Sequence, residues 1–205
     1  NSLNIISENS ATVGSFDLGF YKTKDGSNEV LTDLENNKFE IVYLLGQDSL
    51  KFKKRNEFII YQGSHGDNGA EMADIILPGA AYTEQNGYFT NLEGKLQKAY
   101  KASYPPGEAK EDWLIINELA ETMNHRKLFN DKDELESSLL NQINLYIEKD
   151  FSKKSIDILN INFEENKLEI KHDDYYYSNV IARASKTMFE CSNSKTKLKL
   201  TGTEG

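Results

Sequence analysis

Residues 57–79, EFIIYQGSHGDNGAEMADIILPG, contain the pattern that decides the fold. Short apolar runs at 58–61 and 74–77 enclose a glycine-rich connection, which leads into a short helical stretch at 70–73. Uninterrupted apolar runs of this length are typical of strands that are buried on both faces, as in a parallel sheet. The chain must cross over between two parallel strands, and such crossovers are right-handed. The stretch therefore predicts a strand, a loop, a short helix and a second, parallel strand.

A third apolar run precedes this stretch at 41–45 and ends at Gly46. Three such runs, separated by polar connections, predict the α/β class with a mostly parallel sheet flanked by helices. Pro78 has no backbone N–H, so we expect it to end the last of these strands. Beyond it, short glycine-bounded segments at 87–91 and 94–97 are expected to pair as an irregular hairpin.

Helical patterns dominate much of the remaining chain. A weak alternation over 1–20 predicts the end of a helix. Further along the chain, Asp131 and Glu134 have the spacing of a capping box, so another amphipathic helix is expected to begin there. Before this helix, apolar residues recur at helical spacing over 109–123, which predicts a helix with one buried face. The residues of that face are Trp113, Ile116, Leu119, Ala120 and Met123.

The C-terminal part has a different composition from the strands and their connections. A last helix is predicted within 178–192, and the polar residues 193–205 are expected to form a frayed end. The inward residues of that helix would be Val180, Ile181, Ala184 and Met188. The chain is therefore predicted to divide into an α/β domain at 1–124 and a helical, irregular C-terminal extension at 125–205.

Composition excludes several classes of protein. With 33 acidic and 24 basic residues the net charge is −9, which disfavours binding to nucleic acid. No apolar run approaches the ~20 residues that cross a bilayer. Cys191 is the single cysteine, so neither an internal disulfide nor a cysteine-based zinc or iron–sulfur site can be built from this segment alone. The N-terminus lacks a starting Met and the features of a signal peptide, and we expect the chain to be part of a longer one.

Three features carry candidate chemistry. The loop 66–69 could cradle a phosphate, but Asp67 would repel it, and a tight turn is the simpler interpretation. His65 could act as a base, although a lone histidine more often belongs to a polar network. Glu84 and Glu93 could form an acid–base pair, whereas carboxylates in turns more often accept hydrogen bonds from backbone amides.

The segment ADIILPGAAYTEQNGYFTNLEGKLQ, residues 73–97, resembles a motif of the molybdopterin oxidoreductase superfamily. Lys95 stands where that motif usually has arginine. Four stretches, at 42–50, 58–84, 105–121 and 175–191, resemble the C-terminal third of the large iron–sulfur subunits of respiratory NADH:quinone oxidoreductase (complex I). The positions of 73–97 that match the motif are Ala73, Asp74, Leu77, Pro78, Glu84, Gly87, Asn91, Glu93 and Gly94.

This resemblance implies a segment that supports and docks and has no catalytic residue, cofactor or metal of its own. Glu84, Asn91, Glu93 and Gly94 would then be remnants of a cofactor cleft. The whole subunit would carry 4Fe–4S and 2Fe–2S clusters on the electron path from NADH and flavin to quinone. Its partners would be other peripheral-arm subunits. It would lie on the cytoplasmic face of a bacterial inner membrane, or on the matrix side in a mitochondrion.

Two alternatives remain open at this stage. The chain could be a domain of a genuine molybdopterin enzyme, with Glu84, Asn91 and Glu93 at a live cofactor site. It could also be an autonomous α/β domain that binds a small molecule such as a nucleotide.

Overall fold

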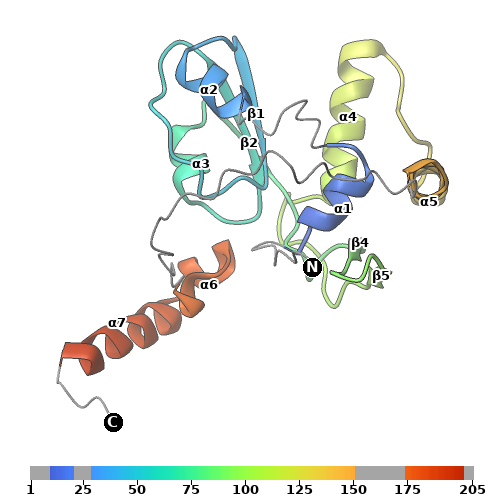
Figure 1. Cartoon of the computed structure of the whole chain (residues 1–205). Coiled ribbons are helices and arrows are strands. Elements are labelled where there is room, and N and C mark those ends of the chain that lie inside the picture. The colour runs from blue at the N-terminus through green and yellow to red at the C-terminus, as the bar shows by residue number, and fades with distance from the viewer. Residues whose placement is uncertain (1–9, 21–28, 151–173, 201–205) are drawn as a thin grey trace, which may run out of the picture.

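The computed structural model describes residues 10–20, 29–150 and 174–200 (Figure 1). In chain order these residues form α1 (Thr12–Asp17), α2 (Glu29–Glu35), β1 (Ile41–Leu45), β2 (Phe58–Gly63), α3 (Asn68–Met72), β3 (Ile75–Pro78), β4 (Gly87–Thr90), β5 (Leu96–Ala99), α4 (Asp112–Asn124), α5 (Lys132–Asp150), the 3-10 helix η2 (Tyr175–Tyr177), α6 (Val180–Ala184) and α7 (Lys186–Leu200).

The predicted parallel sheet is confirmed. Its three strands have the order β1-β2-β3, with Tyr43 opposite Ile60 and Ile60 opposite Ile75. The crossover from β2 to β3 contains α3, as the glycine-rich connection predicted. Each strand corresponds to one of the apolar runs, so the α/β class follows from the sequence.

The third strand ends at Pro78, as predicted. Pro78 belongs to β3 and lies opposite Gly63. Gly79 donates the next hydrogen bond to the Gly63 carbonyl at 3.0 Å. The missing N–H of Pro78 therefore costs no bond to β2, while its carbonyl accepts one from Lys110 at 3.1 Å.

The buried apolar cluster lies on one face of the sheet. Leu44, Ile59 and Tyr61 are at most 4% exposed and pack together. The expected burial on both faces is met only in part: on the opposite face Gln62 is fully buried, while Ile41 and Phe58 are 64% and 43% exposed. A continuous apolar run shows that both faces can be buried, but not what covers them.

The antiparallel hairpin β4–β5 and the helix α4 are also confirmed. The buried stripe of α4 differs from the prediction: Ile115 is buried, Trp113 is half-buried and Met123 is 70% exposed. The buried side chain of Asn117 accepts hydrogen bonds from the amides of Leu128 and Phe129, at 2.8 and 3.0 Å. This amide fastens the turn that leads from α4 to α5.

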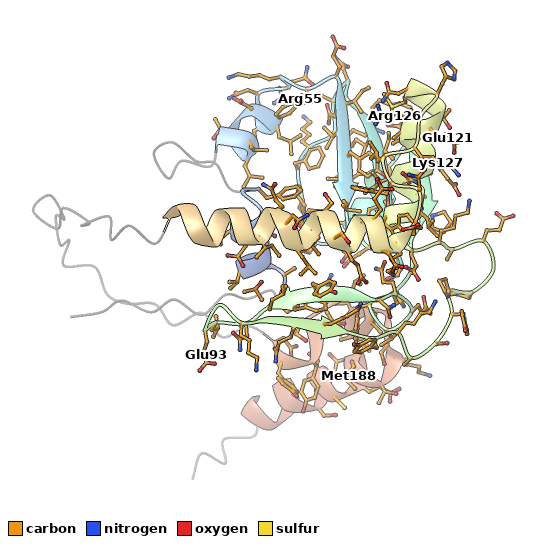
Figure 2. The ribbon with its side chains drawn as sticks, turned by 90° about the vertical axis from the view of Figure 1, so that its right-hand side faces the viewer. Arg55, Glu93, Glu121, Arg126, Lys127 and Met188 are labelled. Carbon is orange, nitrogen blue, oxygen red and sulfur yellow. The ribbon has the colours of Figure 1, made fainter. Side chains whose placement is uncertain are left out.

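The long helix α5 begins as predicted. Asp131 accepts a hydrogen bond from the Glu134 amide at 2.9 Å, while the Glu134 carboxylate accepts one from the Asn130 amide at 2.8 Å. Ile143 is buried and Leu140 is 38% exposed. Figure 2 shows α5 crossing the view between the parallel sheet and the hairpin.

Two other helical regions differ from expectation. The polar stretch before β1 contains α2, whose Leu34 is buried. The single C-terminal helix is instead η2, α6 and α7, with a break at Ser185, and α7 continues through Leu200 where a frayed end was expected. Of the predicted inward residues of this region, Ala184 is exposed. None of the described helices combines the length and apolar character that a bilayer crossing needs.

Candidate functional site

The carboxyl edge of the parallel sheet is the natural place to look for a site, because open α/β sheets bind ligands beyond the carboxyl ends of their strands. Here β1 leads to Asp48, and β2 leads to His65 and Asp67. The end of β3 leads to Gly79 and then to the turn before Glu84. Several of the candidate residues from the sequence therefore lie at or near one edge.

Tyr61 organises the first part of this edge. Its hydroxyl donates to Asp48 Oδ1 at 2.5 Å and lies 2.7 Å from the His65 carbonyl. Burial, and next the contact with Asp48, raise the pKa of Tyr61. A methyl group at Gly69 would lie 2.6 Å from the Gln47 carbonyl and 2.9 Å from the Tyr61 ring, so close packing requires glycine there. Tyr61 is a buried hydrogen-bond donor here and does not ionise near neutral pH.

The loop 66–69 caps a helix. Asp67 Oδ1 accepts a hydrogen bond from the amide of Asn68 at 2.9 Å, which starts α3. The other carboxylate oxygen accepts one from Arg183 Nε at 2.6 Å. Burial alone would raise the pKa of Asp67, but Arg183 and the Asn68 amide outweigh it and lower that pKa overall. The loop thus holds a carboxylate that is paired with a cation, which does not suit a phosphate.

Arg183 is one of the residues at this edge that the sequence did not reveal. It comes from α6, 116 residues away from Asp67. Its Nη2 atom lies 4.0 Å from Asp48 Oδ2, and its Nη1 donates to the Tyr177 carbonyl at 3.3 Å. Figure 1 shows α6 and α7 extending below the end of the sheet that carries α3. A pairing over this distance in the sequence leaves no local pattern that could reveal it.

Asp112, at the start of α4, occupies the second part of the edge. Its carboxylate accepts hydrogen bonds from Gln62 Nε2 at 2.8 Å and from Gln85 Nε2 at 2.7 Å, and its amide donates to Gln85 Oε1 at 3.1 Å. A methyl group at Gly79 would lie 2.7 Å from Asp112 Oδ1. Asp112, Gln62 and Gln85 are therefore paired with one another beyond the ends of β2 and β3, and Asp112 and Gln85 also line a cavity.

The four cleft candidates from the sequence lie in two separate turns of the described residues. Glu84 lies before β4, and its carboxylate accepts a hydrogen bond from the Ala81 amide at 2.9 Å. Asn91 lies in the hairpin turn, where its side-chain oxygen accepts from the amides of Glu93 and Lys95 at 3.0 and 2.9 Å. Gly94 has a φ of 79° in the same turn, and the exposed Glu93 lies at its tip (Figure 2). Their origin as a cofactor cleft stays a prediction.

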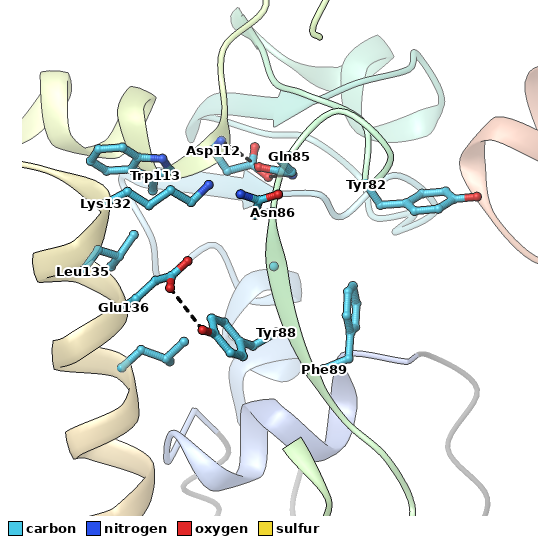
Figure 3. A pocket seen from close by; sticks show the side chains of 12 residues that line it. Tyr82, Gln85, Asn86, Tyr88, Phe89, Asp112, Trp113, Lys132, Leu135 and Glu136 are labelled. Carbon is cyan, nitrogen blue, oxygen red and sulfur yellow. Dashed lines mark hydrogen bonds between the residues drawn. The ribbon is translucent and has the colours of Figure 1, made fainter. Parts of the chain in front are cut away.

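A cavity of about 310 Å³ lies between the hairpin, α4 and α5. Figure 3 shows Tyr88 pointing from β4 toward Glu136 of α5, to which its hydroxyl donates at 3.1 Å. Lys98 donates to the same carboxylate oxygen at 2.7 Å, and this bond is the main reason that the pKa of Glu136 is lowered. On another wall, Lys132 pairs with Glu111. Glu136 and Lys132, which line the cavity, are therefore already paired with Lys98 and Glu111.

The remaining candidates from the sequence are His65 and Cys191. His65 Nδ1 lies 2.9 Å from the hydroxyl of its neighbour Ser64. Cys191 is a half-buried thiol on α7. Among the residues that the structure describes, no group of three His, Cys, Asp or Glu side chains is placed to hold a metal ion.

The chain has a parallel sheet with paired side chains at its carboxyl edge. The sequence comparisons show the family to which it belongs. Residues 1–122 match the molybdopterin oxidoreductase family, and the chain belongs to it. This agrees with the resemblance found at 73–97.

Individual relatives narrow the comparison. The chain is 36% identical over 208 residues to the NADH-ubiquinone oxidoreductase 75 kDa subunit of Reclinomonas americana, a match that covers 94% of this chain and 29% of the relative. It is 40% identical over 206 residues to a subunit of the NADH-quinone oxidoreductase of Rickettsia bellii, with 97% and 28% covered. The mitochondrial NADH-ubiquinone oxidoreductase 78 kDa subunit of Candida albicans is 36% identical over 207 residues, with 93% and 27% covered. The chain thus spans less than a third of the length of these relatives.

Proposed function

We propose that the chain is the C-terminal part of a 75 kDa-type subunit of NADH:quinone oxidoreductase, complex I. Relatives that match over nearly the whole chain are named as subunits of this oxidoreductase, which supports the assignment. Within the subunit, the segment supports and docks and performs no chemistry of its own. The observation that carries this role is the carboxyl edge, where Asp112 is bound by Gln62 and Gln85, and Arg183 by Asp67, so that these groups are paired within the protein itself.

The redox centres belong to other parts of the assembly in this proposal. A 4Fe–4S or 2Fe–2S cluster needs several thiolates, and Cys191 is the single cysteine of the chain. The whole subunit would therefore hold its clusters in a region outside these 205 residues, on the path from NADH and flavin to quinone. Its partners would be other peripheral-arm subunits, on the cytoplasmic face of a bacterial inner membrane or on the mitochondrial matrix side.

In this proposal the segment consists of two parts with different roles. Residues 1–124 would be the end of the molybdopterin-oxidoreductase-like α/β domain, which corresponds closely to the family match at 1–122. Residues 125–205 would be a helical extension that contacts neighbouring subunits. Exposed Tyr175 and Phe189, at 80% and 54%, are suited to such contacts because buried aromatic anchors dominate many interfaces.

Metal and pterin analysis of the intact assembly tests this function against a genuine molybdopterin enzyme. We expect the protein to copurify with other complex I subunits, with iron and flavin present and molybdenum and pterin absent. One molybdenum and one pterin per chain would contradict the proposal and show that the protein is a molybdopterin enzyme with an occupied cofactor site. A matched preparation of a known molybdenum enzyme, purified in parallel, controls for loss of the metal.

A further inference from the structure

The C-terminal residues 174–200, which we call the C-terminal arm, form a unit with its own internal bonds. Asp174 accepts a hydrogen bond from the Tyr176 amide at 3.0 Å and another from the Ser192 hydroxyl of α7. Asn179 caps α6 by accepting from the Ala182 amide at 2.9 Å. The bond between Asp174 and Ser192 joins η2 to α7, whereas the other two lie within η2 and α6, and none of the three involves the sheet. The arm is therefore held by its own bonds as well as by its contact with the sheet.

Arg183 connects the arm to the carboxyl edge of the sheet. Its guanidinium meets Asp67 at 2.6 Å and faces Asp48 at 4.0 Å. Both acids are already held by other bonds, since Asp67 caps α3 and Asp48 accepts from Tyr61. The side chains of Arg183 and Asp67 are 28% and 24% exposed, so the contact is only partly shielded from water.

We propose that Arg183 is a latch that holds the C-terminal arm across the carboxyl edge of the sheet. The latch closes the edge at which sheets of this architecture bind ligands. Releasing it opens that edge and frees the arm while the sheet stays folded. The sheet's core, formed by Leu44, Ile59 and Tyr61, contains no residue of the arm, so the arm can open at a lower free energy than the whole domain.

The geometry requires arginine at position 183. Its planar group donates from Nε to Asp67 and from Nη1 to the Tyr177 carbonyl, while Nη2 faces Asp48. A lysine has one nitrogen and cannot meet three partners that lie in these directions. Arg183→Lys is therefore expected to weaken the latch although it keeps the charge.

Hydrogen exchange of backbone amides in the intact protein tests the latch. In Arg183→Gln we expect exchange at 67–70 and at 182–189 to rise by about tenfold, as loss of a charged hydrogen bond predicts. Exchange in β1 and β2 is expected to stay as in the wild type. Unchanged exchange at 67–70 would overturn the proposal, because the contact would then be incidental. An equal rise throughout the sheet would also overturn it, because the contact would then be part of the global fold.

Two further variants make the test specific. Asp67→Asn keeps a good helix cap but removes the charge that Arg183 meets, so it should raise exchange in the arm as Arg183→Gln does. Exchange rates in the double variant should exceed those of either single variant by no more than about twofold, because Arg183→Gln and Asp67→Asn remove the same interaction. Additive effects would contradict the latch. Lys127→Gln breaks an exposed ion pair with Glu121 at 3.9 Å, and as the matched control it should change neither segment.

Discussion

The parallel sheet and the C-terminal arm are held by different forces. The sheet depends on apolar side chains that are removed from water, with Ile59 at 0% exposure. The arm depends on a charged contact, that of Arg183 with Asp67, which remains partly exposed. Burial of apolar surface is insensitive to protonation, whereas an ion pair fails when its carboxylate is protonated. The comparison therefore predicts large effects of core substitutions and smaller, pH-dependent effects at the arm.

The largest effect is expected at the centre of the sheet. Ile59→Ala removes a side chain that is fully buried against Leu44 and Tyr61, so it should lower the free energy of unfolding by about 2–5 kcal/mol. Denaturant unfolding of the 205-residue chain measures this. Ile76→Ala is the control, since Ile76 is 55% exposed and should change stability by about 0.5 kcal/mol or less. Equal losses in the two variants would mean that the core is not where the structure has it.

A moderate effect is expected where β2 and α3 approach each other. Gly69→Ala places a methyl group 2.6 Å from the Gln47 carbonyl, and this overpacking should cost about 1–3 kcal/mol. Gly66→Ala meets only the Ala70 side chain, at 4.0 Å, and serves as the matched control in the same unfolding measurement. If Gly69→Ala were as stable as the control, the close packing against Tyr61 would be wrong.

A smaller effect concerns the pH dependence of the arm. The pKa of Asp67 is lowered in the folded protein, so its pairing with Arg183 contributes stability above the ordinary aspartate value of about 3.9. That contribution is lost as the pH falls through the lowered pKa of Asp67. Carbon NMR of the carboxyl group should give a midpoint below the ordinary value in the wild type and a higher one in Arg183→Gln. An unchanged midpoint would remove Arg183 as the cause.

The smallest effect is expected at the turn after β3. Glu84→Gln keeps an oxygen that can accept from the Ala81 amide, so the free energy of unfolding should change by about 0.5 kcal/mol or less. Glu84→Leu, which removes the acceptor, should cost about 1–3 kcal/mol more if that amide is left without a partner. A large loss in Glu84→Gln would indicate that the charge itself is needed there.

Local patterns were sufficient for most of the fold. The strands, the hairpin and the start of α5 follow from short apolar runs, glycine positions and the Asp131–Glu134 spacing, all of which act within a few residues. The helix α2 was missed because a stretch of seven residues has too few turns to show a period. The exposure of Ile41 could not be predicted, since it depends on which segments cover the second face.

The carboxyl edge was only partly predictable. The sequence indicated that 66–69 is a turn and that Asp67 disfavours a phosphate, and Asp67 indeed caps α3. It gave no sign of Arg183 or of the bonds from Gln62 and Gln85 to Asp112, which join residues between 27 and 116 positions apart. Such pairings depend on the folded arrangement, and no short motif encodes them.

The central claim is that this segment supports electron transfer without taking part in its chemistry. The most direct measurement is NADH-to-quinone turnover per assembled complex, with Glu84→Gln and Glu93→Gln introduced together into the full-length subunit. The account predicts turnover close to that of the wild type, because both carboxylates lie in turns. A loss of about 10²-fold or more with normal assembly, typical of groups that take part in proton transfer, would contradict it.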